Sequence, residues 1–538
     1  MLLLLLLAAP DIVFADFEGA GFGAWKTTGT AFGAGPAAGT LPHQMPVSGF
    51  EGKRLANSYH GGDRTTGTLS SPPFKIERKF IAFLVGGGGH VGKTCVNLVI
   101  DGKTVRSATG PVEGSEALEQ EAWDVAGLAG KKATIVAVDD HTGGWGHILL
   151  DHIVFTDKKP ASLEEGKREI VAERKYLLLP VKDGARMRKV AVSDGKETLR
   201  RFDIELADGK PDWWASLDIS AWKGRTLTVE GKGLPATLEQ ADAPRVEGAY
   251  KEALRPLLHF TARRGWINDP NGLVYRDGTY HLFFQHNPYG VKWGNMHWGH
   301  ATSKDLVHWE EQGEALYPDR MGPMFSGSAV VDHENTAGFG KNALVLAYTA
   351  FGPPATQCLA WSLDGKKWTK YGKNPVVRNI APEDRDPKVF WHAPTKRWVM
   401  ALYVGPKGKD GKVVHTIRFL TSPDLKGWIS RGSVEGFFEC PDLFPLRLDG
   451  KTRWVLTGAS SEYMVGDFDG ETFKPETKKL PGHRGRGFYA AQTFDNTAGR
   501  RIQVGWGQMP SPGMPFTGMM TFPCELSLRK QPDGPRLV

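Results

Sequence analysis

Three acidic residues in the C-terminal half of the chain have neighbours that suit acid–base and nucleophilic chemistry. Asp269 lies in the stretch WINDPNG, Asp386 in RDP and Glu439 in ECPDLF. Two carboxyl groups in different protonation states can cleave a glycosidic bond, because one attacks the sugar carbon while the other gives its proton to the leaving oxygen. In enzymes that retain the configuration of the sugar, these two groups stand about 5–5.5 Å apart.

The surroundings of Asp269 and Glu439 differ in the way that such a division of roles requires. Glu439 follows Phe437 and Phe438, and an apolar setting favours a carboxyl group that keeps its proton. Asp269 follows Asn268 and precedes further amide groups of the same stretch, which favour a carboxylate by hydrogen bonding. We therefore expect Asp269 to be ionised and Glu439 to be protonated.

Each of the three motifs also has a purely structural interpretation. DP followed by NG is a turn by composition, RDP can be a surface turn with a charge pair, and a Glu beside Cys and Pro can end a strand. Taken alone, Asp269 is as easily a turn residue as a catalyst. The catalytic interpretation requires a fold that brings the three acids together.

A repeat in the same part of the chain predicts such a fold. The pattern S-x-D-x-x-x-W begins at Ser303, Ser362 and Ser422, about 60 residues apart, and a weaker copy begins at Asp467. A Ser/Asp turn before an aromatic residue, once in every 50–60 residues among short strands, is typical of the blades of a β-propeller. The three acids would then lie on different blades and face one axis.

Two further modules precede this part, and both are predicted to be β-rich. Apolar or alternating runs separated by Gly and Asp-Gly turns predict strands in each of them. These runs are 80–85, 95–100, 133–138 and 147–155 in the first module, and 176–181, 199–206, 213–220 and 225–231 in the second. The GGGGH stretch at 86–90 lacks the GK[ST] ending of a phosphate loop and is predicted to connect strands. We predict domains at 16–157, 158–250 and 255–538.

The first 15 residues resemble a signal segment. Leu2 to Ala9 form an apolar run that is too short to span a membrane, and Val13-Phe14-Ala15 would serve as a cleavage site. A positively charged start is missing, and residues 11–19 can equally form the first strand of the first module. We expect an exported protein without a transmembrane helix.

The composition excludes several classes of protein. The 538 residues carry a net charge of +7, but no run of five or six like charges occurs, which indicates a solvated surface rather than a nucleic-acid or membrane partner. The 66 Gly, 35 Pro and 17 Trp favour many turns and short strands over long helices. Trp also supplies the flat apolar faces on which sugar rings stack, and a neutral substrate fits this composition.

Cysteine and histidine usage predicts neither a zinc site nor a disulfide framework. The four cysteines stand far apart without a CxxC pair. His297 and His300 in MHWGH stand three residues apart, but no third ligand stands nearby in the sequence. We predict no metal and no organic cofactor.

Eight ordered motifs of the C-terminal part resemble glycoside hydrolase family 32, the β-fructosidases (invertases, levanases and inulinases). They are WINDPNG (266–272), LFFQHNP (282–288), WGNMHWGHA (293–301), FSGS (325–328), RDP (385–387), ECPDLF (439–444), FYAAQTF (488–494) and RRIQVGWG (500–507). The resemblance covers about 255–538. It implies an all-β chain whose catalytic domain is a five-bladed propeller, with the site at the axial mouth, preceded by two β-sandwich-like modules.

The resemblance also implies roles for individual residues. Asp269 would be the nucleophile, Glu439 the general acid/base, and Asp386 the stabiliser of the transition state. The substrate-binding residues that it implies are Asn268, Gln285, Trp293, Ser326, Arg385 and Trp506. The implied reaction is hydrolysis of β-D-fructofuranosidic bonds in levan, inulin or sucrose, with retention, through a covalent fructosyl-enzyme.

The chain departs from the family at two places. Gly487 stands where members often carry an acid before the FYA segment, which places one substrate contact in doubt. The chain ends at Val538, where the family usually continues into a C-terminal β-sandwich, so we expect that sandwich to be absent or truncated. The first module resembles a jelly-roll carbohydrate-binding domain, and the second resembles the small β domain of some bacterial levanases.

Two other functions are compatible with the sequence. A fructosyltransferase uses the same intermediate and passes it to an acceptor sugar instead of water. A non-catalytic fructan-binding protein could use the same scaffold, but all three acids are present, which argues against it. The large additional modules favour a polymeric substrate over sucrose, and the oligomeric state is left open.

Overall fold

We describe the protein from a computed structural model that covers residues 10–110, 115–160, 165–185, 187–207, 209–408, 410–483 and 485–538. The first nine residues of the predicted signal segment lie outside the described residues. Within the described part, the regular elements are β-strands and two short 3-10 helices, η1 (Ala126–Leu128) and η3 (Ser220–Trp222). The prediction of an all-β chain is confirmed. None of the helices described has the length and apolar character needed to cross a membrane.

The chain divides into two compact units. The first comprises Met1–Ile170, Gly184–Val192 and Thr226–Thr237, and the second comprises Val171–Asp183, Ser193–Arg225 and Leu238–Val538. The strands of the middle module are thus shared between the units. The domain boundaries predicted from the sequence stay a prediction.

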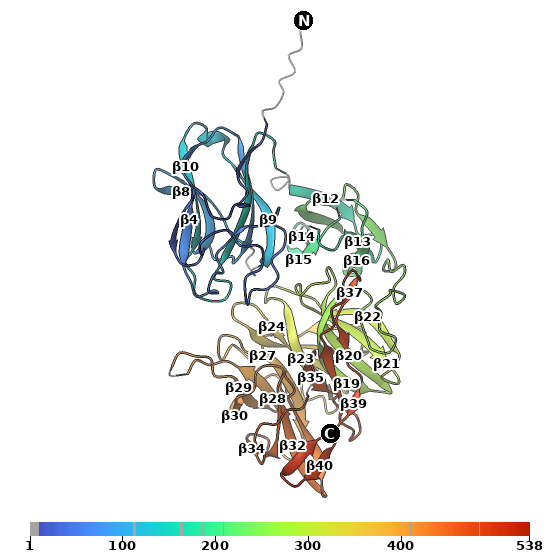
Figure 1. The fold of residues 1–538 in the computed structure, drawn as a ribbon. Coiled ribbons are helices and arrows are strands. Elements are labelled where there is room, and N and C mark those ends of the chain that lie inside the picture. Colours follow the sequence, from blue (N-terminus) through green and yellow to red (C-terminus); the bar gives the residue numbers. More distant parts are fainter. Residues whose placement is uncertain are drawn as a thin grey trace. The chain divides into compact units, whose positions relative to one another are not determined.

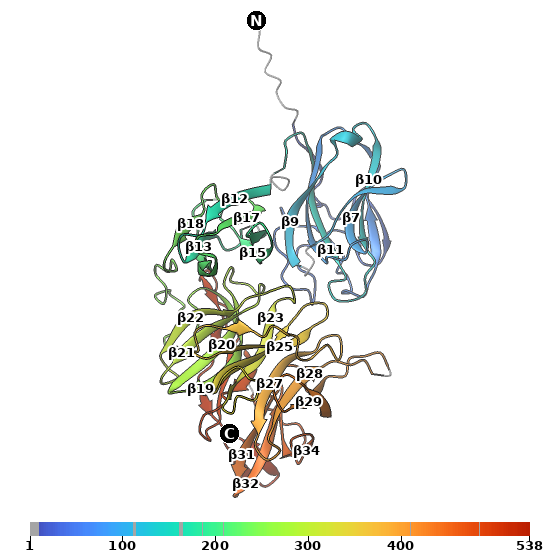
Figure 2. The same cartoon turned by 180° about the vertical axis from the view of Figure 1, so that it is seen from behind.

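The first unit contains a two-layer sandwich of antiparallel sheets. One layer has the order β1 (Ile12–Ala15), β11 (Ile148–Thr156), β6 (Phe80–Gly87), β9 (Ser115–Asp124), with β3 (Ala56–Asn57) also paired to β11. The other has the order β2 (Lys26–Gly29), β4 (Gly67–Ser70), β10 (Lys132–Asp139), β7 (Thr94–Ile100), β8 (Lys103–Ala108), with β5 (Phe74–Lys75) also paired to β10. Figures 1 and 2 show these layers in blue.

Alternating apolar residues of both layers form one core. Ile81, Phe83 and Val85 of β6 meet Val96 and Leu98 of β7 between the sheets. Their spacing of two places all of them on one face of each strand. All four strand-like runs predicted for this module are strands in the structure.

A carboxyl group buried in this sandwich makes its stability depend on pH. Asp151 is fully buried, and one of its oxygens accepts a hydrogen bond from the amide of Glu51 at 2.8 Å. Burial raises the pKa of Asp151 to about 7. Because the folded pKa exceeds the unfolded value of about 3.9, the folded state binds the extra proton, and stability falls as the pH rises from about 4 to 7.

We predict that Asp151→Asn stabilises the sandwich above pH 7 by roughly 2–4 kcal/mol and has little effect at pH 4. The amide keeps an oxygen for the Glu51 N–H but carries no charge to bury. Scanning calorimetry of the full chain at both pH values measures the effect. An equal change in melting temperature at pH 4 and pH 8 would contradict the titration of Asp151 as its cause.

The middle module contributes strands to both units. Within the first unit lie β12 (Glu165–Val171), β17 (Thr226–Lys232) and β14 (Met187–Ser193), which pair in this order. Within the second unit lie β15 (Thr198–Glu205) and a sheet in the order β16 (Trp213–Asp218), β13 (Tyr176–Val181), β18 (Glu239–Ala241). The predicted strand runs of this module coincide with β13, β15, β16 and β17.

Five antiparallel sheets follow one another in the rest of the second unit. They are β19 (Gly265–Arg276), β20 (Thr279–Asn287), β21 (His297–Ser303), β22 (Trp309–Leu316); β23 (Met324–Asp332), β24 (Ala343–Ala350), β25 (Thr356–Ser362), β26 (Thr369–Lys370); β27 (Arg385–His392), β28 (Arg397–Val404), β29 (Thr416–Ser422), β30 (Ile429–Glu435); β31 (Asp442–Leu448), β32 (Lys451–Thr457), β33 (Tyr463–Phe468), β34 (Phe473–Pro475); and β35 (Phe488–Thr493), β36 (Ile502–Gly507), β38 (Met519–Met520), β39 (Cys524–Glu525). A hairpin of β40 (Leu528–Gln531) and β41 (Gly534–Leu537) ends the chain described.

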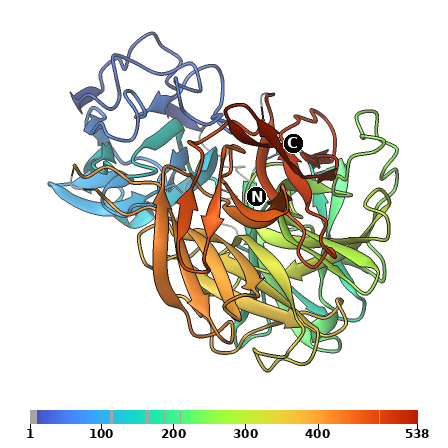
Figure 3. The same ribbon diagram turned by 90° about the horizontal axis from the view of Figure 1, so that it is seen from below.

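These sheets are the blades of a five-bladed propeller, as predicted. The first strands of successive sheets contact one another from β19 to β23 and β27 and from β31 through β35 back to β19. The ring is closed by β37 (Phe516–Thr517), which comes from the last segment and pairs in parallel with β19 of the first blade. Figure 3 shows the sheets succeeding one another around a centre, from green through yellow and orange to dark red.

The predicted repeat is the turn between the third and fourth strands of a blade. In each copy the aspartate Oδ1 accepts hydrogen bonds from the two amides that stand two and three residues later. The residue after the aspartate has a positive φ in all four copies: +68° at Leu306, +70° at Gly365, +65° at Leu425 and +100° at Gly470. The side chain and this left-handed residue together set the sharp turn.

One interpretation from the sequence is wrong. The DP-NG stretch is not a turn, because Gly265–Arg276 is one strand, β19. Its pairing with β20 is irregular at two places, between Ile267 and Pro270 and between Asn271 and Val274. Proline and Asn-Gly occur here because β-bulges accept a residue without an N–H and a residue with positive φ.

Candidate active site

The propeller brings the three predicted acids to one end of its inner strands. Asp269 is the fifth residue of β19, Asp386 is the second residue of β27, and Glu439 stands three residues before β31. The pairing of β27 is irregular just after Arg385, and Asp386 and Glu439 have φ values of +64° and +27°. Bulges and left-handed residues re-aim side chains, so irregular backbone positions these carboxylates.

Cys440 joins two of the acids. Its buried thiol donates weak hydrogen bonds to Asp269 Oδ2 at 3.5 Å and to Asp386 Oδ2 at 3.4 Å. Its amide also donates to Asp386 Oδ2 at 3.0 Å. A single residue of the segment that carries Glu439 therefore fixes the two aspartates relative to each other.

Arg385 and Tyr489 hold the third acid. Arg385 Nε donates to Glu439 Oε2 at 2.9 Å and lies 3.9 Å from Asp386 Oδ2. The Tyr489 hydroxyl donates to the other oxygen of Glu439 at 2.7 Å. Arg385 also stacks over the Tyr403 ring at 4.6 Å, which fixes its orientation. The three acids thus belong to one connected network.

The electrostatics differ in part from the expectation. Burial raises the pKa of Asp269, while hydrogen bonds from Ser326 and Asn268 oppose the rise. Burial also raises the pKa of Asp386, the charge of Glu439 adds to it, and Arg385 opposes it. The predicted hydrogen bonds to Asp269 are present, but burial and the neighbouring carboxylate outweigh them.

The apolar setting expected for Glu439 is not what the structure shows. Both of its oxygens accept hydrogen bonds, as described above. Phe437 packs instead into the core shared with β28, β29 and β32, and Phe438 packs edge-on against Tyr403 and His415. The aromatic neighbours in sequence therefore support the segment from outside, and polar groups contact the carboxylate itself.

Three of the six predicted substrate-binding residues contact the acids directly. Ser326 Oγ donates to Asp269 Oδ2 at 2.6 Å, and Asn268 Nδ2 donates to Asp269 Oδ1 at 3.1 Å. Arg385 is the third, through Glu439. In this state their donors are occupied by the carboxylates.

The other three stand around this centre. Trp506 packs edge-on against Trp266 and Tyr489, with ring centroids 5.8 and 6.4 Å apart. Trp293 is 59% exposed and meets Phe325, the neighbour of Ser326, edge-on. The remaining residue, Gln285, is buried and donates to the carbonyl of Met324 at 2.8 Å, just before the Ser326 segment.

The middle module anchors the loop that carries Trp293. Lys292 Nζ donates to Glu205 Oε1 at 2.6 Å. Asn295 Nδ2 donates to the carbonyl of Asp203 at 2.7 Å, and its oxygen accepts the Asp203 amide at 2.8 Å. Both partners lie on β15 within the same compact unit. The rim of the site therefore depends on contacts made outside the propeller.

We predict that Asn295→Gly raises KM about tenfold and changes kcat much less. Asn295 has φ +45°, which glycine adopts without strain, so the change spares the backbone. It removes the two hydrogen bonds to Asp203 and a third to Asn287 Oδ1 at 3.0 Å. The two bonds to Asp203 are worth about 1–3 kcal/mol together. Steady-state kinetics on a substrate of this site measures the effect. Asn342→Gly, at another left-handed asparagine (φ +58°), is the matched control and should leave KM unchanged.

Sequence reasoning missed three residues of the centre. Cys440, Tyr489 and Trp266 each lie in a motif that was recognised, ECPDLF, FYAAQTF or WINDPNG, but no role was given to them. Trp266 Nε1 donates to Asn268 Oδ1 at 3.0 Å, which turns the amide of Asn268 toward Asp269. A second polar or aromatic residue within a motif that holds a catalytic acid is the signal that could have found them.

A ring of polar contacts below the acids ties the blades together. Gly327 N donates to Asn271 Oδ1 at 3.2 Å, and Ser328 Oγ donates to the Pro387 carbonyl at 2.7 Å. Next in the ring, Lys388 pairs with Asp442 at 3.2 Å, and both are buried. Asn271, Lys388 and Asp442 follow the three acids by two or three positions, so these contacts fix the segments that carry the acids.

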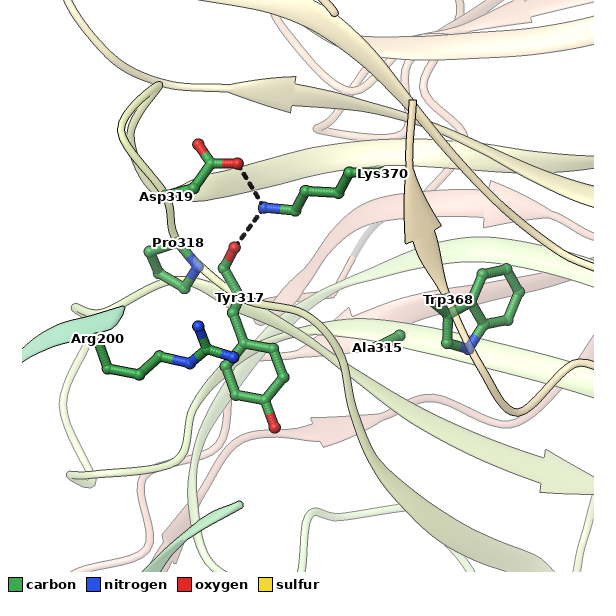
Figure 4. A pocket seen from close by; sticks show the side chains of 7 residues that line it. All are labelled: Arg200, Ala315, Tyr317, Pro318, Asp319, Trp368 and Lys370. Carbon is green, nitrogen blue, oxygen red and sulfur yellow. Dashed lines mark hydrogen bonds and ion pairs between the residues drawn. The ribbon is translucent and has the colours of Figure 1, made fainter. Parts of the chain in front are cut away.

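A pocket of about 290 Å³ lies elsewhere in the same unit (Figure 4). It is lined by Arg200, Ala315, Tyr317, Pro318, Asp319, Trp368 and Lys370. Lys370 Nζ donates to Asp319 Oδ2 at 2.7 Å and stands near the Tyr317 carbonyl. None of the three acids lines it, so this pocket is separate from the candidate active site.

The histidine pair considered as metal ligands points elsewhere. His300 shares a hydrogen bond of 3.0 Å with His281, whereas His297 binds the Asn295 carbonyl. Three residues apart on β21, they face opposite sides of the sheet. Over the ranges that the structure describes, no three His, Cys, Asp or Glu side chains converge in a way that could hold a metal ion.

Comparison with known families and proteins gives matches over the propeller and the middle module. The model of the Glycosyl hydrolases family 32 N-terminal domain matches residues 259–538, slightly more than half of the chain. A second model, Domain of unknown function (DUF4980), matches residues 167–243.

Individual relatives cover the same part of the chain. The levanase of Bacillus subtilis is 44% identical over 326 residues, which are 54% of this chain and 47% of that protein. The extracellular exo-inulinase of Aspergillus niger is 38% identical over 346 residues, 52% of this chain and 63% of that protein. The chain therefore spans less than two thirds of either relative. The crystal structure of the exo-inulinase from Aspergillus awamori matches 54% of this chain and 67% of its own, at 34% identity and a TM-score of 0.49.

Proposed function

The chain belongs to glycosyl hydrolases family 32, and from this premise we propose that it hydrolyses β-D-fructofuranosidic bonds in levan, inulin or sucrose with retention of configuration. The observation that carries the proposal is the single network of Asp269, Asp386 and Glu439 through Cys440 and Arg385. Three carboxylates from three blades share one site, and paired carboxylates are what glycoside cleavage requires.

In the first step, Asp269 attacks the anomeric C2 of a fructofuranosyl unit while Glu439 protonates the leaving oxygen. A covalent fructosyl-enzyme forms, and the rest of the substrate leaves as an alcohol. In the second step, the ionised Glu439 takes a proton from water, which attacks C2 and releases fructose and the free Asp269 carboxylate. The configuration at C2 is inverted twice and is therefore retained.

The neighbouring groups are suited to these steps. The Ser326 hydroxyl and the Asn268 amide orient the Asp269 carboxylate, and Cys440 keeps it at a fixed distance from Asp386. Asp386 would accept hydrogen bonds from sugar hydroxyls, which strengthen as the ring gains oxocarbenium character. Trp293 and Trp506 would supply aromatic faces for the sugar rings.

We further propose that the protein is exported. The apolar run at 2–9 supports this, as does its relation to an enzyme named as an extracellular exo-inulinase. Its partner is then an extracellular fructan or sucrose. The large modules before the propeller favour the polymer.

Incubation of the purified protein with levan, inulin and sucrose, followed by chromatography of the released sugars, tests the proposal. Fructose alone from levan indicates removal from chain ends, and a ladder of oligomers indicates internal cleavage. Longer products formed from sucrose would indicate transfer to an acceptor sugar instead. Release of no sugar from any of the three substrates would overturn the proposal.

A further inference from the structure

The loops at one end of the N-terminal sandwich gather polar and aromatic side chains that the proposed function does not use. They are the connections that lead into β4 and out of β10, the Gly-rich stretch between β6 and β7, and the start of β9. Figure 2 labels β7, β9, β10 and β11 of this sandwich. All of these residues lie in the first compact unit.

A chain of hydrogen bonds runs through this end of the sandwich. His147 is buried between two carboxylates, with Nδ1 2.7 Å from Asp63 Oδ1 and Nε2 3.2 Å from Glu116 Oε2. Gln44 Nε2 donates to the same oxygen of Glu116 at 2.9 Å, and Asn57 Nδ2 donates to Gln44 Oε1 at 2.8 Å. Each side chain fixes the next, so the partly exposed carboxylate of Asp63 faces solvent in a set orientation.

A second carboxylate in this cluster has unused acceptors. Asp139, at the end of β10, is 1% exposed. Its nearest polar neighbours are Ser58 and the amide of His141, and its nearest charged groups are His147 and Asp63. Among the described residues, neither of its oxygens has a well-formed hydrogen bond. Because Asp139 is buried, its charge costs free energy, and burial raises its pKa to about 7.

Aromatic rings stand beside these carboxylates. Trp145 has φ +58°, a conformation that bulky residues rarely adopt, and lies in a Gly-Gly-Trp-Gly stretch that presents its ring. The ring is partly exposed and stacks on His147 with centroids 5.7 Å apart. Tyr59 meets His147 edge-on at 4.9 Å from another loop. A hydrogen bond connects the Gly-rich stretch that ends at His90 with the one that holds Trp145. His90 Nε2 lies 3.1 Å from the Gly144 carbonyl.

We propose that this end of the sandwich binds a neutral polysaccharide. Trp145 and Tyr59 would offer apolar faces to the C–H sides of sugar rings, while Asp63 would accept hydrogen bonds from hydroxyl groups. The cation alternative is less favoured, because the His147 ring separates Asp63 from Glu116 and the described residues form no metal-binding group of three. The site is separate from the propeller, and its binding does not depend on the proposed hydrolysis.

Native gel electrophoresis of the full chain through gels that contain levan, inulin or mixed-linkage β-glucan tests the inference. The intact protein is expected to be retarded by at least one of them. Trp145→Gly should weaken that retardation about tenfold, since the ring that stacks on the sugar is lost. Glycine adopts the backbone conformation of Trp145 without strain, so the variant tests the ring rather than the fold. Asp63→Asn should weaken binding as well, with the side chain shape kept.

The matched control is Trp391→Ala, which removes a partly exposed Trp of the propeller. It should leave retardation unchanged. Because all chains carry the same acids of the propeller, a difference between Trp145→Gly and the control reports the sandwich alone. Equal retardation of Trp145→Gly and the intact protein would overturn the proposal, as would retardation by none of the three polymers. Retardation that is abolished by EDTA and restored by calcium would indicate a cation site instead. Hydrolysis of fructans is measured separately, so either proposal can fail without the other.

Discussion

Replacement of Asp269 by alanine is expected to lower kcat on levan, inulin and sucrose by about 10⁴-fold or more, because no other group can form the covalent intermediate. The Asp269 carboxylate accepts hydrogen bonds from Ser326, Asn268 and Cys440, which fix its position. Cys440 cannot replace it, because burial and the nearby carboxylates raise the pKa of its thiol well above the usual value. Loss of a nucleophile removes an interaction made only in the transition state, so KM should change little.

The loss in Asp269→Ala should not come from unfolding. Burial raises the pKa of Asp269, which means that the folded protein disfavours its charge, and removal of such a group commonly leaves a protein as stable or more stable. Initial rates and melting temperatures are measured together, with the exposed Asp467→Ala as control. Wild-type rates in Asp269→Ala, or a fall in rate that follows a fall in melting temperature, would refute the assignment.

The repeat and the motifs predicted the propeller, because they record local chemistry. An aspartate that accepts two amides of its own turn has the same signature in four of the five blades, at Asp305, Asp364, Asp424 and Asp469. Strand runs in the N-terminal modules were equally visible, since alternation of apolar residues reports a half-buried strand. The five sheets follow from signals within about 60 residues.

The detailed geometry of the site could not be predicted in the same way. The DP-NG stretch has the composition of a turn, and only its pairing with β20 makes it a bulged strand. The two Phe residues before Glu439 predict an apolar surrounding, but Arg385 and Tyr489, 54 and 50 positions away, reach the carboxylate. Contacts across blades depend on bulges and on left-handed residues such as Asp386, for which the sequence carries no periodic signal.

The shared middle module is a further feature that sequence alone did not indicate. Its β15 residues Asp203 and Glu205 fix the loop around Trp293 by hydrogen bonds to Asn295 and Lys292. A strand read as part of a separate module thus helps to shape the rim of the candidate site.

Replacement of Glu439 by alanine is expected to lower kcat on levan about 10²–10⁴-fold, the usual contribution of a general acid or base. The size of the loss should depend on the leaving group. An alkoxide leaving group from a fructan needs the proton of Glu439, whereas a nitrophenolate leaves without one. The Glu439→Ala variant should therefore form the fructosyl-enzyme from a nitrophenyl fructofuranoside nearly as fast as the intact protein, and only the second step, in which Glu439 activates water, should remain slow.

This pattern separates catalysis from a structural role of Glu439. The carboxylate also accepts hydrogen bonds from Arg385 and Tyr489, so its removal frees both donors and could disturb the site. A disturbed site would slow both substrates by the same factor. A burst of nitrophenolate followed by slow turnover is the expected result, because the intermediate forms quickly and then accumulates. Glu439→Gln, which retains an oxygen for one donor and cannot transfer a proton, should show the same burst. Equal losses on the two substrates, with no burst in either variant, would assign Glu439 to positioning rather than to proton transfer.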